Sequence, residues 1–267
     1  MNKIQAANET IRIYSAREYE ANGKKIVFPE GDYEDVEVIT PAMGEELIDK
    51  KFEVFAERPM CKITVINSDS YAAAKKLNGA LVMNFANAHQ PGGGFRTGAS
   101  AQEEGLCRCS TLYQSITSGK AKEMYTYNNT HMSKVESDYM LISKDVLVFR
   151  DEHLNLLEVP FKTSVITMPA PNRYGAAFFA SSELIEKTFR RRIEIMIKAA
   201  MERGYKNLVL GAWGCGAFGN KPAEVAGYFK EIIVDKGYGR SFDEICFAIY
   251  GSEDGRNITA FRKVLME

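Results

Sequence analysis

The feature that most constrains the fold is a unit that occurs twice, an apolar strand followed by a glycine-rich loop and then a helix. The first unit begins at Leu81 as LVMNFANAHQPGGGF, and the second begins at Asn207 as NLVLGAWGCGAFGN. Buried strands that alternate with helices are typical of α/β folds with a largely parallel sheet. Ligands of open α/β sheets bind beyond the carboxyl ends of the strands. We therefore expect both loops at one ligand-binding edge.

The rest of the chain continues this alternation. We expect strands at 24–28, 62–67, 80–85, 139–143, 146–149, 156–159, 164–168, 207–210 and 244–250. We expect helices at 8–20, 70–77, 100–117, 181–203, 222–236 and 254–266. The stretch 1–60 has too few apolar residues for a core of its own. We expect a single domain, 1–267, in which 1–60 is a helical extension packed on a core of 61–267.

Charge and hydropathy argue against several kinds of partner. The net charge of −1 gives no bulk field toward nucleic acid or an anionic membrane. No apolar run reaches the ~18 residues that a membrane span requires. The first residues, MNKIQAANETIRIY, lack the apolar core of a secretion signal. We expect a cytoplasmic protein with no membrane contact and no direct nucleic-acid binding.

The cysteines and histidines do not form a recognisable metal or disulfide pattern. Five cysteines are present, an odd number, and no Cys-x-x-Cys occurs. Cys107 and Cys109 lie two positions apart, and such residues do not share a face of a helix. The three histidines are scattered. Free buried thiols, without a metal site, are the expectation.

The two glycine loops suggest a phosphate site. Neither loop ends in Gly-Lys-Ser/Thr, and the Gly-x-Gly-x-x-Gly spacing is missing, so Walker and Rossmann motifs are excluded. One such loop could simply form a turn, whereas two at equivalent strand ends favour a clamp around a diphosphate. Trp213 and Phe218 in the second loop are either core residues, or Phe218 offers its ring to a sugar or base.

Glu103 and Glu104 follow the first loop at the start of a predicted helix. Ser100 and Glu103 fit a capping box, and Glu104 could form a surface ion pair with Arg108. The alternative is general acid catalysis. A helix N-terminus lowers the pKa of a carboxyl, whereas burial and a nearby diphosphate raise it. We therefore expect one glutamate to become a competent acid when substrate is bound.

The Gly-Gly-Gly run, a short spacer and Gln-Glu-Glu together resemble the signature of poly(ADP-ribose) glycohydrolases of the microbial type. Asn84-Phe85-Ala86-Asn87 is similar to the strand end of macrodomains, and 214–220 is similar to their second phosphate loop. The resemblance covers roughly 60–267. It implies a macrodomain-like three-layer α/β/α fold with a mixed, largely parallel central sheet.

The resemblance also implies roles for individual residues. Glu104 would protonate the leaving ribose oxygen and then activate water, and Glu103 would hold ribose hydroxyls. Asn87 and Phe218 would contact the distal ribose, and the glycine loops would wrap the diphosphate. The substrate-binding residues implied are Asn87, Gly92, Gly93, Gly94, Gln102, Gly214, Cys215, Gly216, Ala217, Phe218, Gly219 and Asn220. The family uses no metal or cofactor. The substrate would be ADP-ribose polymer or ADP-ribosylated protein.

Several alternatives remain open at this level. A hydrolase of single ADP-ribose units attached to an acceptor would share the same site. An ADP-ribose reader would not need the intact Gln-Glu-Glu, and an unrelated nucleotide-sugar enzyme would carry it by chance. The first 58 residues could cap the polymer end and enforce exo-cleavage. For the adenine pocket, 67–69 and 169–172 are candidates.

Overall fold

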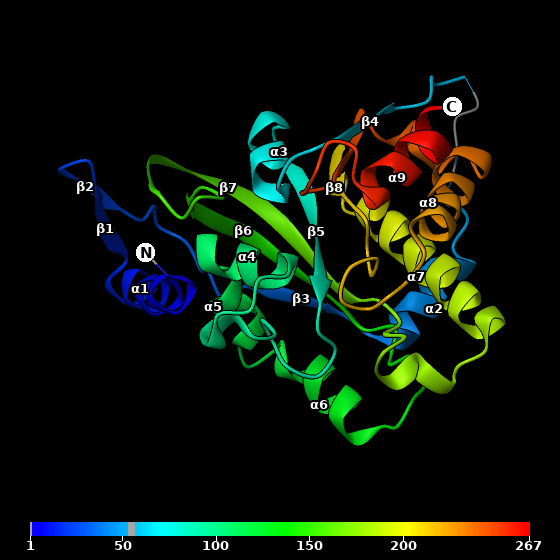
Figure 1. The fold of residues 1–267 in the computed structure, drawn as a ribbon, viewed down its shortest axis with the longest axis horizontal. Coiled ribbons are helices and arrows are strands. Elements are labelled where there is room, and N and C mark those ends of the chain that lie inside the picture. Colours follow the sequence, from blue (N-terminus) through cyan, green and yellow to red (C-terminus); the bar gives the residue numbers. More distant parts are fainter. Residues whose placement is uncertain (1, 53–56) are drawn as a thin grey trace.

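The computed structural model describes residues 2–52 and 57–267, and a seven-stranded sheet forms its centre (Figure 1). The strands are β3 (Val36–Ile39), β4 (Lys62–Ile66), β5 (Ala80–Ala86), β6 (Met140–Arg150), β7 (Leu156–Pro169), β8 (Asn207–Leu210) and β9 (Glu244–Ala248). Their order is β3-β6-β7-β5-β8-β9-β4. Pairs from β7 to β4 are parallel, whereas β6 runs antiparallel to both β7 and β3. This mixed, largely parallel sheet confirms the expected fold class.

Helices cover both faces of the sheet (Figure 1). They are α1 (Lys3–Ala16), α2 (Pro41–Asp49), α3 (Ser70–Lys76), α4 (Gln102–Cys109), α5 (Leu112–Thr117), α6 (Lys122–Thr130), α7 (Ser182–Glu202), α8 (Pro222–Lys230) and α9 (Arg256–Met266). The helices α2, α7, α8 and α9 lie on one face, and α1, α3, α4, α5 and α6 on the other. No helix in the described parts of the chain is long and apolar enough to cross a membrane.

The central strand β5 shows why its sequence is apolar throughout. Leu81 and Met83 point into the core beneath α7 and α8, whereas Ala80 and Val82 point into the core beneath α4 and α5. Side chains alternate between the two faces of a strand, and here both faces are covered. Burial on both sides therefore fixes β5 in the sheet, so that the loop after it starts from a rigid strand end.

The first 60 residues contribute more than a helical extension. Asn2 caps α1, and Arg17 ends it in the left-handed conformation, so the helix expected at 8–20 lies earlier. A hairpin of β1 (Glu18–Ala21) and β2 (Lys24–Val27) follows, and β3 then joins the edge of the main sheet. The helix α1 packs on α4, where the Thr10 hydroxyl donates to the Arg108 carbonyl at 2.6 Å.

Two expectations for the middle of the chain were wrong, and one helix was missed. The helix expected at 100–117 is two helices, because the chain breaks at Ser110, which forms a β-bridge with Val148. The four short strands expected between 139 and 168 are two long strands, β6 and β7, and a register shift marks the bulge between Ser143 and Val146. Asp145 in this bulge has φ +53°. The helix α6 was not predicted.

Candidate active site

The amino terminus of α4 lies against the end of β5, with the first glycine loop between them in sequence. The helix begins after Ala101, and no side chain caps it. The predicted capping box of Ser100 with Glu103 is therefore wrong. The Glu103 carboxyl is free to turn inward, because it forms no capping hydrogen bond with the backbone at the start of α4.

The Glu103 carboxyl is held by three N–H donors and is only 3% exposed. The Asn87 backbone donates to Oε2 at 2.8 Å, and the Gly92 backbone and the Asn84 amide each donate to Oε1 at 3.3 Å. Burial raises the pKa of Glu103 to about 8. The hydrogen bonds from Asn87 and Asn84 lower this pKa, whereas the nearby charge of Glu104 raises it further. Burial therefore favours the protonated form of Glu103 in the free protein.

Glu104 is 7% exposed, and its two carboxyl oxygens have different surroundings. Oε1 accepts a hydrogen bond from the Gly94 N–H at 2.9 Å. Oε2 is buried and has no partner within the described residues. The expected ion pair with Arg108 is wrong, because Arg108 is itself buried and forms no ion pair within 2–52 and 57–267. An oxygen that is fixed in place and lacks a donor is suited to meet a ligand hydroxyl or leaving oxygen.

Gly93 is the residue that allows this placement. Its φ is +51°, and a Cβ built on it would overlap Oε1 of Glu104 and lie 3.4 Å from Oε2 of Glu103. Both carboxyls thus sit directly under the backbone of the loop. The loop turns its N–H groups toward the protein, since Gly93 donates to the Gln90 carbonyl at 3.0 Å while its two glycine neighbours hold the carboxyls.

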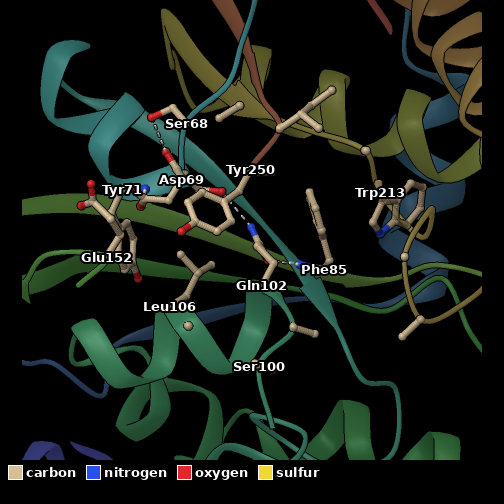
Figure 2. A pocket seen from close by; sticks show the side chains of 18 of the residues that line it. Ser68, Asp69, Tyr71, Phe85, Ser100, Gln102, Leu106, Glu152, Trp213 and Tyr250 are labelled. Atoms are coloured by element: carbon tan, nitrogen blue, oxygen red, sulfur yellow. Dashed lines mark hydrogen bonds between the residues drawn. The ribbon is translucent and has the colours of Figure 1, made fainter. Parts of the chain in front are cut away.

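Gln102 ties α4 to the sheet (Figure 2). Its Nε2 donates to the Met83 carbonyl at 2.7 Å and to the Ser70 hydroxyl at 3.0 Å, and its Oε1 accepts from the Phe85 N–H at 2.9 Å. The side chain lines the neighbouring cavity, but protein groups occupy its amide. The geometry makes Gln102 a brace that fixes the start of the helix.

A cavity of about 540 Å³ opens beside α4 along the carboxyl ends of β4, β9, β8 and β5 (Figure 2). Asp69, Tyr71 and Tyr250 line one part of it, and the second glycine loop lines another. Of the predicted site residues, the lining includes Gln102, Gly214, Gly216, Ala217 and Phe218. The others are not among the lining residues: Asn87, Gly92, Gly93, Gly94, Glu103, Glu104, Cys215, Gly219 and Asn220.

The second glycine loop turns its N–H groups outward. The backbone N–H groups of Gly214, Gly216, Ala217 and Phe218 have no protein acceptor in the described chain, and all four residues line the cavity. Asn220 fastens the loop from behind, donating to the carbonyls of Pro171 at 2.8 Å and Gly214 at 3.0 Å. A loop with several free N–H groups facing a cavity forms an anion-binding nest.

The aromatic residues of this loop have different roles. Trp213 is completely buried, and its Nε1 donates to the Met168 carbonyl at 3.2 Å, so it is a core residue. Phe218 is half-buried and lines the cavity. The ring of Phe218 is therefore the one that can contact a ligand.

Sequence reasoning overlooked several residues of the site or left them as candidates. Asp69 lines the cavity and caps α3 through Oδ1, whereas its buried Oδ2 has no partner in the described structure. Tyr71, Leu106 and Tyr250 were not expected, although Tyr250 ends a predicted strand. Ala170 is the only lining residue from the candidate stretch 169–172. Asn87 shapes its own loop, because its Oδ1 accepts from the backbones of two following residues.

The cysteines are free and buried, as expected, and burial raises the pKa of Cys107 well above its ordinary value. Within 2–52 and 57–267, no three potential metal-binding side chains come together. Glu103 and Glu104 are an adjacent pair of buried carboxyls at the start of α4.

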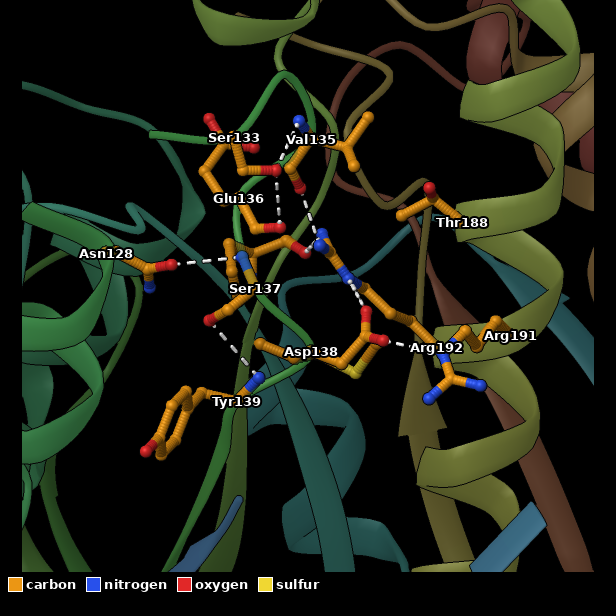
Figure 3. Close-up of polar contacts among 12 residues, drawn as sticks. Asn128, Ser133, Val135, Glu136, Ser137, Asp138, Tyr139, Thr188, Arg191 and Arg192 are labelled. Carbon is orange, nitrogen blue, oxygen red and sulfur yellow. Dashed lines mark hydrogen bonds and ion pairs between the residues drawn. The ribbon is translucent and has the colours of Figure 1, made fainter. Parts of the chain in front are cut away.

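A polar network joins the segment 131–139, which we call the rim segment, to α6 and α7 (Figure 3). Arg192 of α7 is 1% exposed and donates to Asp138 at 2.8 Å and to the Pro169 carbonyl at 2.9 Å. Asn128 of α6 donates to the Ala88 carbonyl at 3.1 Å and accepts from the backbone of the same rim segment. The segment 131–139 is thus fixed to the ends of both β5 and β7.

The chain matches the family model described as microbial-type PARG, catalytic domain, over residues 7–151. It is similar to the poly(ADP-ribose) glycohydrolase structure from Thermomonospora curvata, with 34% identity, coverage of 98% of this chain and 99% of that chain, and a TM-score of 0.89. The same enzyme bound to the inhibitor ADP-HPD matches with a TM-score of 0.87, 34% identity and coverage of 98% of each chain. The Deinococcus radiodurans glycohydrolase in complex with ADP-ribose matches at 0.77, with 34% identity and coverage of 88% and 95%. A comparison with curated proteins gives no match.

Proposed function

Because the chain belongs to the family of microbial-type poly(ADP-ribose) glycohydrolases, we propose that its cavity binds the terminal ADP-ribose unit and that Glu104 protonates the leaving oxygen. The protein is a glycosidase that hydrolyses poly(ADP-ribose) and releases ADP-ribose. The observation that carries the assignment of Glu104 is its environment, with one oxygen fixed by Gly94 and the other buried and without a partner.

The proposed placement of ADP-ribose follows the order of the strand ends. The adenine lies at the ends of β4 and β9, where Oδ2 of Asp69 can accept from its amino group and Tyr250 lines the wall. The diphosphate lies on the free N–H groups of 214–218. The distal ribose then lies toward β5, between Phe218 and the two carboxyls. In this arrangement Gly92–Gly94 hold the glutamates, and the second loop binds the diphosphate.

The proposed reaction uses the two glutamates in different roles. Glu104 gives its proton to the oxygen that leaves the distal ribose, the C1″–O bond breaks, and an oxocarbenium-like ribose forms. The ionised Glu104 then takes a proton from water as the water oxygen bonds to C1″, which restores the acid. Glu103, whose protonated form burial favours, can hydrogen-bond the ribose hydroxyls without adding a second negative charge beside Glu104.

We further propose that 1–60 and 61–267 act as one catalytic domain, because β3 completes the sheet and α1 supports α4. The net charge of −1 supports recognition of the polymer through its end unit, without contact to nucleic acid or membranes. Five free buried cysteines are typical of a reducing compartment and support a cytoplasmic location.

The decisive experiment compares product release from labelled poly(ADP-ribose) by the wild type and the Glu104→Gln variant. Loss of a general acid is expected to reduce ADP-ribose release by at least ~100-fold. Both proteins should bind free ADP-ribose, which shows that the variant is folded. Unchanged release by Glu104→Gln would overturn the assignment. Binding without any release by the wild type would favour the hydrolysis of single ADP-ribose units or a reader.

A further inference from the structure

The sheet order shows on which side of the site the rest of the polymer lies. The proposed substrate crosses the strand ends from adenine at β4 and β9, through the diphosphate at β8, to the distal ribose at β5. The next strand in this direction is β7, and the loop that follows it spans 170–181. The leaving unit, which is attached to the distal ribose, must therefore pass over this loop.

Exposed aromatic side chains gather on that loop. Tyr174 is 76% exposed, Phe178 is 67% exposed and Phe179 is 80% exposed. The rings of Phe178 and Phe179 lie 4.9 Å apart in an edge-to-face arrangement. In the described chain, the other large aromatic residue with comparable exposure is Tyr250, which lines the cavity itself. Clustered apolar rings exposed on a surface mark an interaction site.

The aromatic loop is fixed to the second glycine loop. The Arg173 backbone donates to the Phe218 carbonyl at 3.0 Å, and its Nε donates to Asn220 at 3.0 Å. The ring of Tyr174 covers Gly219 so closely that a Cβ there would lie 2.6 Å from the ring. The Tyr174 ring is therefore joined to the loop that we propose binds the diphosphate, and Phe178 and Phe179 follow it in the same segment.

We propose that Tyr174, Phe178 and Phe179 form a second subsite, which stacks the adenine of the ADP-ribose unit next to the terminal one. The inference rests on the proposed function. In the polymer, the ribose that supplies the leaving oxygen also carries an adenine, so this base lies one sugar away from the scissile bond. An adenine is flat and uncharged, and aromatic side chains bind such bases through their faces. The subsite would favour an adenosine leaving group over a small acceptor.

The test measures binding in the Glu104→Gln background, with two ligands, free ADP-ribose and a two-unit ADP-ribose oligomer. Stacking on an aromatic side chain contributes roughly 5- to 150-fold in affinity per base. Phe178→Ala/Phe179→Ala should weaken binding of the oligomer by a factor in this range and leave the Kd of ADP-ribose unchanged. Val159→Ala, which truncates an exposed apolar residue near the other end of β7, should change neither value.

Three results would overturn the subsite. The double variant could bind the oligomer as tightly as the parent, it could lose affinity for both ligands equally, or sedimentation could show that the rings are buried between two copies of the chain. A separate assay of ADP-ribose release by the wild type isolates the other possible failure. If the wild type releases ADP-ribose but the ring substitutions do not change oligomer binding, only the subsite is refuted. If the wild type releases no ADP-ribose, the proposed function is refuted.

Discussion

Gly93→Ala tests whether the first glycine loop sets the position of the Glu104 carboxyl, which we propose to be the general acid. An alanine at φ +51° adds strain of about 1–2 kcal/mol, because Cβ meets the following carbonyl oxygen. The same Cβ would overlap Oε1 of Glu104, so either the carboxyl or the loop must move. Loss of the hydrogen bond from the Gly94 N–H adds about 0.5–1.5 kcal/mol. The free energy of unfolding should therefore fall by about 1.5–3.5 kcal/mol.

The effect on catalysis should be larger than the effect on folding. A displacement of a reacting group by about 1 Å reduces the rate by roughly 100-fold. We expect kcat for ADP-ribose release to fall to about this extent, while the protein still unfolds cooperatively at a lower Tm. Steady-state kinetics and a thermal melt measure the two effects on the same sample.

Gly227→Ala is the matched control. Gly227 lies in α8, and a Cβ there meets no atom within 4 Å. Alanine should stabilise this helix by up to about 1 kcal/mol and leave kcat unchanged. A Gly93→Ala protein with wild-type kcat and Tm would refute the reasoning, because it would show that the loop does not confine Glu104.

Three further substitutions test other parts of the site. Gly216→Ala adds a Cβ into open space, so Tm should stay constant. If the diphosphate lies there, the Kd of ADP-ribose should rise by about 10-fold or more. An unchanged Kd would contradict the placement. The pKa of Glu103 is raised from 4.5 to about 8, because burial favours its protonated form. The stability that this protonation contributes is therefore full below pH 4.5 and is lost as the pH rises to 8. Over this range the free energy of unfolding falls by at most about 1.4 kcal/mol per pH unit. Glu103→Gln should flatten this decline in urea titrations, and an equally steep decline would argue against a protonated Glu103. Arg192→Ala removes the buried partner of Asp138, which Arg191 still pairs, and leaves the Pro169 carbonyl without its donor. It should cost about 1–3 kcal/mol, measured by urea unfolding, and no measurable loss would show that the network around Asp138 is not structural.

The sequence predicted the main sheet well, because its central strands are apolar on both faces. Strand β5 was predicted to within a residue, since burial on both sides leaves a continuous apolar run. Strands β6 and β7 were divided into short pieces, because their bulge places exposed Lys144 and Asp145 inside one strand. A polar pair in an apolar run looks like a turn unless the partner strand is known.

The sequence motifs identified the residues of the candidate site, but they did not predict which hydrogen bonds these residues form. The sequence indicated that Glu103 and Glu104 follow a glycine loop, and the structure places them there. The direction of each N–H group depends on the backbone angles of the loop, which the glycines leave free. The prediction of a capping box at Ser100 was wrong because the local sequence pattern does not show the competing donors. The Asn87 N–H, 16 residues earlier in the chain, binds the Glu103 carboxyl instead.

The two glycine loops differ in the acceptors of their N–H groups, and under the proposed function this difference separates binding from chemistry. Gly92 and Gly94 donate inward to the two carboxyls, so the first loop acts on the substrate only through Glu103 and Glu104. Residues 214, 216, 217 and 218 present their N–H groups outward to the cavity. A substitution in the first loop should therefore lower kcat with little change in affinity for ADP-ribose, and Gly216→Ala should do the reverse. Equal effects of both substitutions on Kd would show that the two loops clamp the diphosphate together.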